Sequence, residues 1–275
     1  MLLHCAELTL DISQPRIMGI VNVTPDSFSD GGQYDTVDTA VHHAHQLIAA
    51  GADIVDVGGE STRPGAALVG LDEELSRVIP VIAALRGCGA IVSVDTRKPE
   101  VMCAAIAAGA HMVNDVAALQ APGALEAIAQ SDVAVCLMHM AGNPQTMQVM
   151  TNYDDVVITV VGFLQERAAA LIDAGIAQNR IVLDPGFGFG KSLTHNLQLL
   201  KHLDCLIALN YPVLVGMSRK SMLGLMTGRD VDNRLAAGLA AHLSAIHKGA
   251  HIVRVHDVLA CRDALTVWKM IEEIA

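Results

Sequence analysis

The chain has 275 residues, of which 52% are hydrophobic and 17% are charged, so it contains enough apolar material for a large buried core. Its formal net charge of −11 argues against nucleic acid or an anionic membrane as a partner, because both carry negative charge. A small anionic substrate is not excluded, since a local group of Arg and Lys side chains can still form a positive site.

The first residues and the cysteines indicate the compartment. The opening MLLHCAELTLDI lacks the basic, apolar and small-residue order of a signal peptide, and no stretch of the sequence is long and apolar enough to suggest a membrane span. The six cysteines are far apart and form no C-x-x-C pair, which predicts buried, reduced thiols and neither disulfides nor a zinc site. We therefore expect a cytoplasmic protein that does not bind a membrane.

A short β-branched apolar run followed by a helical pattern recurs along the chain. Nearly continuous apolar runs are typical of strands that are buried on both faces of a parallel sheet. The predicted strands are residues 16–22, 53–59, 90–96, 111–116, 133–140, 181–186, 212–218 and 251–256. Alanine-rich helical patterns lie between them, for example at residues 35–50, 72–85, 153–174 and 233–248.

Eight strand–helix units in a chain of this length predict an α/β fold, a (β/α)8 TIM barrel; a doubly wound open sheet is the alternative. No linker or shift of composition interrupts the pattern, so we expect a single domain over residues 1–275. Residues 2–12 alternate like a short β-hairpin, which we expect to plug the N-terminal mouth of the barrel.

Polar side chains gather at the C-terminal ends of the predicted strands. They are Asn22, Asp56, Asp95, Asn114, His139, Asp184, Lys220 and His256. In a barrel these strand ends surround one cavity at the catalytic face. Capping of a strand end explains any one of them equally well, but the whole set favours a functional site.

The stretch DPGFGFGKS, residues 184–192, resembles a phosphate-binding loop at first reading. In such a loop the first glycine would stand at position 185, which is Pro185 and has no N–H to offer a phosphate. We therefore interpret the glycines as a sharp turn beside a flat ligand, with Phe187 or Phe189 near the rim of its site. Lys191 is expected to lie in a solvated loop and to be dispensable for activity.

Four stretches carry a resemblance to a known family: GIVNVTPDSFSDGG (19–32), VGGESTRPGA (57–66), DPGFGFGK (184–191) and GMSRKS (216–221). Together with SVDT, VND, CLMHM and RVHDV in the same order, they resemble the dihydropteroate synthases of folate biosynthesis over nearly the whole chain. The resemblance implies that 4-aminobenzoate is joined to 6-hydroxymethyl-7,8-dihydropterin diphosphate, which gives 7,8-dihydropteroate and diphosphate. It also implies a homodimer.

The residues fit that chemistry. Asp95, Asn114 and Asp184 are short side chains suited to the flat hydrogen-bonding edge of a reduced pterin, and Lys220 can donate to its carbonyl or ring nitrogen. Arg254 can stack its guanidinium on the ring and reach a phosphate.

The diphosphate leaving group requires positive charge and donors, for which Arg254, His256 and Arg63 are candidates. Asn22 can supply one oxygen ligand to Mg²⁺, which keeps several waters and commonly bridges phosphates. The residues assigned to catalysis are Arg63, Asp95, Lys220, Arg254 and His256.

The 4-aminobenzoate site is expected partly on the loops at residues 23–32 and 60–70, which are rich in Gly, Ser, Asp and Pro and are expected to act as lids. Its expected lining is Phe28, Thr62, Arg63, Pro64, Phe189 and Ser221. His42, His43 and His45 resemble a metal cluster, but they belong to a helical pattern far from every strand end, so a solvated helix face is preferred.

Two other functions remain open at this point. A pterin-binding methyltransferase domain shares the barrel and parts of the pterin edge, but it has no need of the STRPGA and GMSRKS stretches. A non-catalytic pterin-binding paralogue is expected to have lost Arg63, Lys220 or His256, and all three are present.

Overall fold

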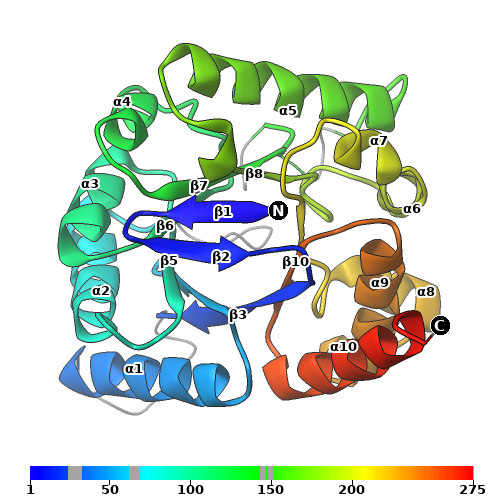
Figure 1. The fold of residues 1–275 in the computed structure, drawn as a ribbon, viewed down its shortest axis with the longest axis horizontal. Coiled ribbons are helices and arrows are strands. Elements are labelled where there is room, and N and C mark those ends of the chain that lie inside the picture. Colours follow the sequence, from blue (N-terminus) through cyan, green and yellow to red (C-terminus); the bar gives the residue numbers. More distant parts are fainter. Residues whose placement is uncertain (24–32, 62–67, 143–146, 148–150, 275) are drawn as a thin grey trace.

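The computed structural model describes residues 1–23, 33–61, 68–142, 147 and 151–274. Eight parallel strands form a nearly closed barrel surrounded by helices, so the predicted (β/α)8 fold is confirmed (Figure 1). The strands are β3 (Arg16–Asn22), β4 (Ile54–Gly58), β5 (Ile91–Asp95), β6 (Met112–Asp115), β7 (Ala134–Met138), β8 (Ile181–Asp184), β9 (Leu214–Val215) and β10 (Ile252–Val255). Their order is β8-β7-β6-β5-β4-β3-β10-β9, and a parallel bridge between Leu183 and Val213 brings the two edges together.

Helices between successive strands cover the outside of the barrel (Figure 1). In the described residues they are α1 (Gln33–Ala49), α2 (Leu71–Ala84), α3 (Pro99–Ala108), α4 (Ala124–Ala129), α5 (Val156–Asp173), α6 (Leu193–Lys201), α7 (Asp204–Ile207), α8 (Ser221–Thr227), α9 (Leu235–His247) and α10 (Val258–Glu272). Local chemistry sets some of their ends: the Asp155 side chain accepts hydrogen bonds from the first backbone amides of α5, and Gly109 ends α3 with a left-handed φ of 106°. None of these helices combines the length and apolar character that a membrane crossing requires.

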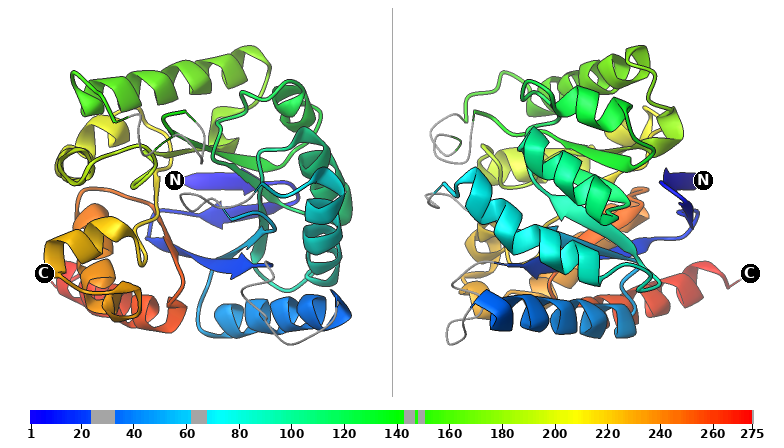
Figure 2. Two further views of the ribbon diagram at one scale, coloured as in Figure 1. Left: turned by 180° about the vertical axis from the view of Figure 1, so that it is seen from behind. Right: turned by 90° about the vertical axis from the view of Figure 1, so that its left-hand side faces the viewer.

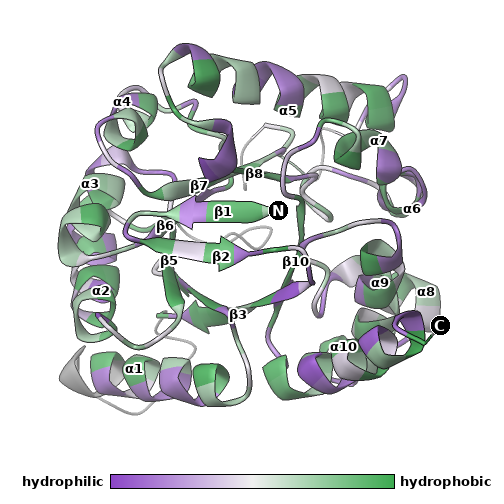
Figure 3. Ribbon diagram, in the orientation of Figure 1, coloured by the Kyte–Doolittle hydropathy of each residue, from purple (hydrophilic) through white to green (hydrophobic). Residues whose placement is uncertain are grey.

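The strands are buried on both faces, as their continuous apolar runs predict. Every residue of β4, β5, β6 and β7 is buried. Figure 3 shows the barrel strands largely in green, whereas α1 alternates between green and purple because one side of it packs on the barrel and the other faces solvent.

An N-terminal hairpin closes one end of the barrel. Its strands β1 (Leu2–Cys5) and β2 (Leu8–Asp11) pair antiparallel and lie across the ring of strands (Figures 1 and 2). Leu3 and Cys5 belong to one buried cluster with side chains from all eight barrel strands: Met18, Ile54, Ile91, Met112, Ala134, Cys136, Val182, Leu214 and Ile252. The hairpin thus plugs the N-terminal mouth as predicted, and it leaves the opposite end of the strands for polar side chains.

All six cysteines are free, as expected. The expectation that they are buried holds for Cys5, Cys136 and Cys261, whereas Cys88 is half-buried. It is wrong for Cys103 and Cys205, which are exposed on α3 and α7. Apolar neighbours in the sequence misled the prediction, because a helix turns successive residues to different sides.

We expect Leu3→Ala to lower the free energy of unfolding by about 2–5 kcal/mol, because the fully buried side chain would leave a cavity between the hairpin and the barrel. Leu2→Ala is the matched control on the same strand, since Leu2 is 53% exposed and its truncation is expected to change stability by less than about 0.5 kcal/mol. Urea unfolding of both variants measures the difference. Equal destabilisation would contradict the role of Leu3 as a plug.

Candidate active site

Arg254 on β10 is held between two carboxylates on neighbouring strands. Its Nε donates to Asp56 Oδ2 at 2.7 Å, and its Nη2 donates to Asp95 Oδ2 at 2.8 Å. Asn114 Nδ2 donates to the same Asp56 oxygen at 3.0 Å. Four strands, β4, β5, β6 and β10, therefore join their polar side chains in one buried network, and three predicted site residues belong to it.

Burial and ion pairing have opposite effects on the pKa values of the charged groups in this network. Desolvation raises the pKa of Asp95 to about 7, although the nearby guanidinium of Arg254 acts in the opposite direction. For Arg254, burial alone would lower the pKa, but Asp56 and Asp95 outweigh it and hold the pKa above its usual value. Arg254 remains a cation, and its Nη1 has no partner among the described residues.

Asp184 and Lys220 form the second part of the site. Asp184 is buried at the end of β8, and its Oδ1 accepts a hydrogen bond from the Gly186 amide at 2.7 Å. Burial raises the pKa of Asp184 and lowers that of Lys220 to about 8, while the attraction between the two groups opposes both shifts. Lys220 also interacts electrostatically with Arg254 and Asp95, so the two parts form one site.

The loop after β8 supports Lys220. Its Nζ donates to the Phe187 carbonyl and lies 4.4 Å from the ring centroid of Phe189. Phe189 is half-buried, as a residue near the rim should be, whereas Phe187 is fully buried in the core and is not a rim residue.

The prediction that Lys191 lies in a solvated loop is wrong. The side chain is only 5% exposed, and its Nζ lies within hydrogen-bonding distance of His139 Nδ1 and of the carbonyls of His139, Gly186 and Phe189. Sequence reasoning placed Lys191 in solvent because it follows the glycine turn, but the turn folds back so that its carbonyls surround the ammonium. The loop does not form a phosphate cradle, because the amides of Gly186 and Gly188 donate to side chains of the protein.

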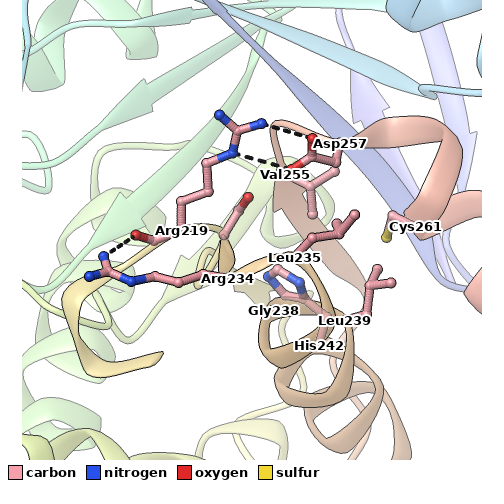
Figure 4. A pocket seen from close by; sticks show the side chains of 10 residues that line it. Arg219, Arg234, Leu235, Gly238, Leu239, His242, Val255, Asp257 and Cys261 are labelled. Atoms are coloured by element: carbon pink, nitrogen blue, oxygen red, sulfur yellow. Dashed lines mark hydrogen bonds and ion pairs between the residues drawn. The ribbon is translucent and has the colours of Figure 1, made fainter. Parts of the chain in front are cut away.

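His256 follows β10 and is half-buried beside Ser218, with 3.0 Å between His256 Nδ1 and Ser218 Oγ. Ser218 is also one of the residues that line a cavity of about 10 Å³, the size of one water molecule. The cavity lies between α9 and the start of α10 (Figure 4). On its rim Arg219 has a left-handed φ of 59°, and its guanidinium pairs with both carboxylate oxygens of Asp257. Arg234 donates to the Arg219 carbonyl at 3.0 Å, so the segment that carries Ser218, Lys220 and Ser221 is fixed from two sides. Ser221 itself is exposed at the first turn of α8.

Four predicted site residues, Phe28, Thr62, Arg63 and Pro64, lie outside the described residues. The ends of the second loop are described. The Glu60 carboxylate accepts hydrogen bonds from Val69 N at 3.3 Å, Arg97 Nη2 at 3.1 Å and Lys98 Nζ at 2.9 Å. It thus ties both ends of that loop to the segment that follows Asp95.

Asn22, at the end of β3, is suited to supply one oxygen ligand to a metal ion. Asn22 is partly exposed, and its amide oxygen has no partner among the described residues. No group of three or more His, Cys, Asp or Glu side chains that would suit a metal ion occurs in the described part of the chain. An oxygen donor of this kind suits Mg²⁺, which takes its remaining ligands from water and phosphate.

On α1, His42 and His45 are exposed, as expected for a solvated face, and His43 is half-buried.

A larger groove of about 890 Å³ lies at the other end of the barrel, beside the N-terminal hairpin. It is lined among others by His4, Arg86, His111, Asp132 and Arg180 and contains none of the predicted site residues. The chemistry of the strand ends, and not the size of the hollow, therefore identifies the candidate site.

Comparison with known proteins agrees with this geometry. The family described as pterin binding enzyme matches residues 18–256. The chain belongs to the pterin-binding enzyme family.

Relatives within the family are similar over nearly their whole length. The dihydropteroate synthase of Escherichia coli (strain K12) is 52% identical over 260 residues, which cover 94% of this chain and 92% of the relative. A structure of Xanthomonas albilineans dihydropteroate synthase with 4-aminobenzoic acid has a TM-score of 0.94 at 54% identity and covers 100% of this chain and 99% of its own. A structure of the enzyme from the same organism with 7,8-dihydropteroate has a TM-score of 0.92 at 51% identity, with coverage of 100% of both chains.

Sequence reasoning gave Asp56 only a place among the strand ends, yet its Oδ2 orients both Asn114 and Arg254. We expect Asp56→Asn to weaken the affinity for a dihydropterin about 10- to 100-fold, the effect of losing a charged hydrogen bond. Titration calorimetry with the pterin alone measures this affinity.

Asp53→Asn is the matched control for this prediction. Asp53 lies just before the same strand and pairs with Arg16 and Arg262 at the N-terminal end of the barrel. Its substitution should change stability but leave pterin affinity within about twofold of the wild type. A similar loss of affinity in both variants would show that Asp56 acts through stability alone.

Proposed function

We propose that this chain is a dihydropteroate synthase, which joins 4-aminobenzoate to 6-hydroxymethyl-7,8-dihydropterin diphosphate and releases diphosphate. The observation that carries the proposal is the joining of Asp95, Asn114, Asp184, Lys220 and Arg254 at one end of the barrel of a pterin-binding enzyme. Relatives at about half identity bear this name, and solved structures of such enzymes hold 4-aminobenzoic acid or 7,8-dihydropteroate.

The pterin edge is assigned to Asp184, Asn114, Asp95 and Lys220. A carboxylate can accept two N–H groups from the guanidine-like edge of the ring, and the Lys220 ammonium can donate to its carbonyl or ring nitrogen. Arg254 is fixed through Nε and Nη2 by Asp56 and Asp95, so its flat face and Nη1 are left for the ring and the phosphate.

The reaction replaces a C–O bond with a C–N bond. The electron pair of the bond between the pterin methylene carbon and oxygen departs with diphosphate. The electron-rich ring stabilises the positive charge that is left on the methylene carbon. The aniline nitrogen then shares its lone pair with that carbon and loses a proton. Arg63, Arg254 and His256 stabilise the charge on the leaving group, so the protein contributes electrostatics and positioning and no nucleophile.

Mg²⁺ is proposed as the cofactor, with Asn22 as its protein ligand. When bound, the ion would neutralise charge on the diphosphate oxygens. Phe28, Thr62, Pro64, Phe189 and Ser221 are assigned to the 4-aminobenzoate site; among them, the described Phe189 and Ser221 lie on the two segments that also carry Asp184 and Lys220.

A diphosphate-release assay tests the function. With dihydropterin diphosphate, 4-aminobenzoate and Mg²⁺ present, we expect release together with formation of 7,8-dihydropteroate, and chelation of Mg²⁺ should remove most of it. The same assay without 4-aminobenzoate should show slower release and no 7,8-dihydropteroate, since the departed diphosphate can recombine with the pterin cation and only water competes for that cation. Pterin binding without any release would favour the non-catalytic paralogue, and transfer of a methyl group to a corrinoid protein would favour the methyltransferase domain.

A homodimer is proposed as the assembly. Large apolar side chains are exposed near the end of α10, where Val267, Met270, Ile271 and Ile274 are between 59% and 79% exposed. Such side chains are typical of a surface that packs against another subunit.

Sedimentation measures the assembly. We expect a dimer for the wild type and a shift towards monomer for Met270→Asp, because an aspartate would place unpaired charge in the contact. Ile158→Asp is the control, since Ile158 is 72% exposed on α5, on the other side of the barrel (Figure 1). A monomeric wild type, or equal behaviour of the two variants, would contradict this interface.

A further inference from the structure

Lys191 is a buried cation whose four polar neighbours all belong to the end of β7 or to the loop after β8. The Nζ atom lies 2.9 Å from the Gly186 carbonyl, 3.0 Å from the Phe189 carbonyl, 3.2 Å from the His139 carbonyl and 3.0 Å from His139 Nδ1. An ammonium has three N–H donors, and these neighbours offer only acceptors when His139 is neutral and carries its proton on Nε2. Burial lowers the pKa of His139 to about 3, so its ring is neutral at physiological pH.

The loop has little rigidity of its own. Gly186, Gly188 and Gly190 have left-handed φ values of 68°, 82° and 67°, and glycine loses more conformational entropy on ordering than any other residue. A Cβ atom at Gly186 would lie 2.0 Å from the His139 carbonyl oxygen, so no other residue can take this position without a shift of the backbone. The flexible turn therefore requires external anchors, and Lys191 contacts it at both Gly186 and Phe189.

The same loop also contacts Asp184 and Lys220, the two residues assigned to the pterin edge. The Gly186 peptide accepts from Lys191 through its oxygen and donates through its N–H to Asp184 Oδ1. Between the two anchored carbonyls, the Phe187 carbonyl accepts from Lys220, and the Phe189 ring lies beneath Lys220 Nζ. A displacement of the loop would therefore move the partners of both Asp184 and Lys220.

We propose that Lys191 is a positioning residue for pterin binding, which holds the loop at residues 186–190 so that Asp184 and Lys220 face the pterin edge. The inference deepens the proposed function and rests on its assignment of Asp184 and Lys220 to that edge. Lys191 itself does not touch the substrate, because its donors are taken by the loop and by His139.

Burial and the nearby charge of Lys220 lower the pKa of Lys191 to about 7, although Asp184 acts in the opposite direction. Four acceptors around one nitrogen favour the protonated form, since a neutral amine would have only two N–H donors for them. The lysine therefore ties together a loop that is rich in carbonyl dipoles, and an apolar side chain of the same length would leave those acceptors unpaired.

The test uses the full-length protein and the dissociation constant of a dihydropterin without diphosphate, measured by calorimetry well below the unfolding midpoint of each variant. Lys191→Met is expected to weaken pterin affinity about 10- to 100-fold, since two charged contacts of the edge lose their support. Lys191→Gln keeps an N–H donor, so it should fold if the Met variant does not and should weaken affinity by a smaller factor.

Two controls separate positioning from stability and net charge. Tyr153→Phe removes the hydrogen bond from Tyr153 Oη to the Gly190 carbonyl, at the other end of the same loop. Lys201→Met removes an exposed lysine of α6 and so makes the same change of residue and charge. Both controls should bind the pterin within about threefold of the wild type.

Pterin affinity within about threefold of the wild type in the folded Lys191 variants would overturn the proposal, whatever their stability. An equal loss of affinity in Tyr153→Phe would overturn it as well, since any weakening of the loop would then suffice. If the wild type bound the pterin but released no diphosphate in the presence of 4-aminobenzoate, the proposed function would fail while the role of Lys191 could still be measured.

Discussion

Arg254 is held between Asp56 and Asp95, and most of the site depends on this arrangement of one half-buried cation and two buried carboxylates. A charge in the interior of a barrel is tolerated only with partners, since desolvation of an unpaired ion costs several kcal/mol. Asp56 lies on β4, Asp95 on β5 and Arg254 on β10, so these strands must have the right register for the three charges to meet. The site is thus a consequence of how the barrel closes, and removing one partner would leave a buried charge unpaired.

The barrel interior is divided along its axis. At the N-terminal end, apolar side chains from all eight strands pack under the hairpin. At the C-terminal end, Asp56, Ser93, Asp95, Asn114 and Asp184 are buried polar residues. Packing of the first layer fixes the positions of the strands, and the positions of the strands fix the polar groups of the second. Stability and function therefore lie in different layers of the same strands.

The strands, the hairpin and four of the helices could be predicted from the sequence because each depends on a local pattern of apolar residues. β9 is shorter than predicted, since only Leu214 and Val215 pair with β10 in a regular ladder. At the site, Asp95, Asn114 and Asp184 lie near the strand ends where their position in the repeat placed them, and Arg254 lies on the last strand as expected. Partners that are distant in the sequence were missed. Ser218 lies beside His256, and Glu60 pairs with Lys98 as well as with Val69, only because the fold brings these residues together, and no spacing in the sequence reveals such contacts.

The glycine-rich stretch after β8 shows why composition alone misleads. In a phosphate loop the backbone amides converge on an anion, whereas here the carbonyls of Gly186, Phe187 and Phe189 accept hydrogen bonds from two lysines. Left-handed glycines permit either orientation of the peptide groups, so the same letters can encode sites of opposite polarity. Pro185 was the local signal against an anion site, because it lacks an N–H. The positive signal for a cation site is the buried lysine that follows the turn, whose charge is stabilised by the carbonyl dipoles that surround it.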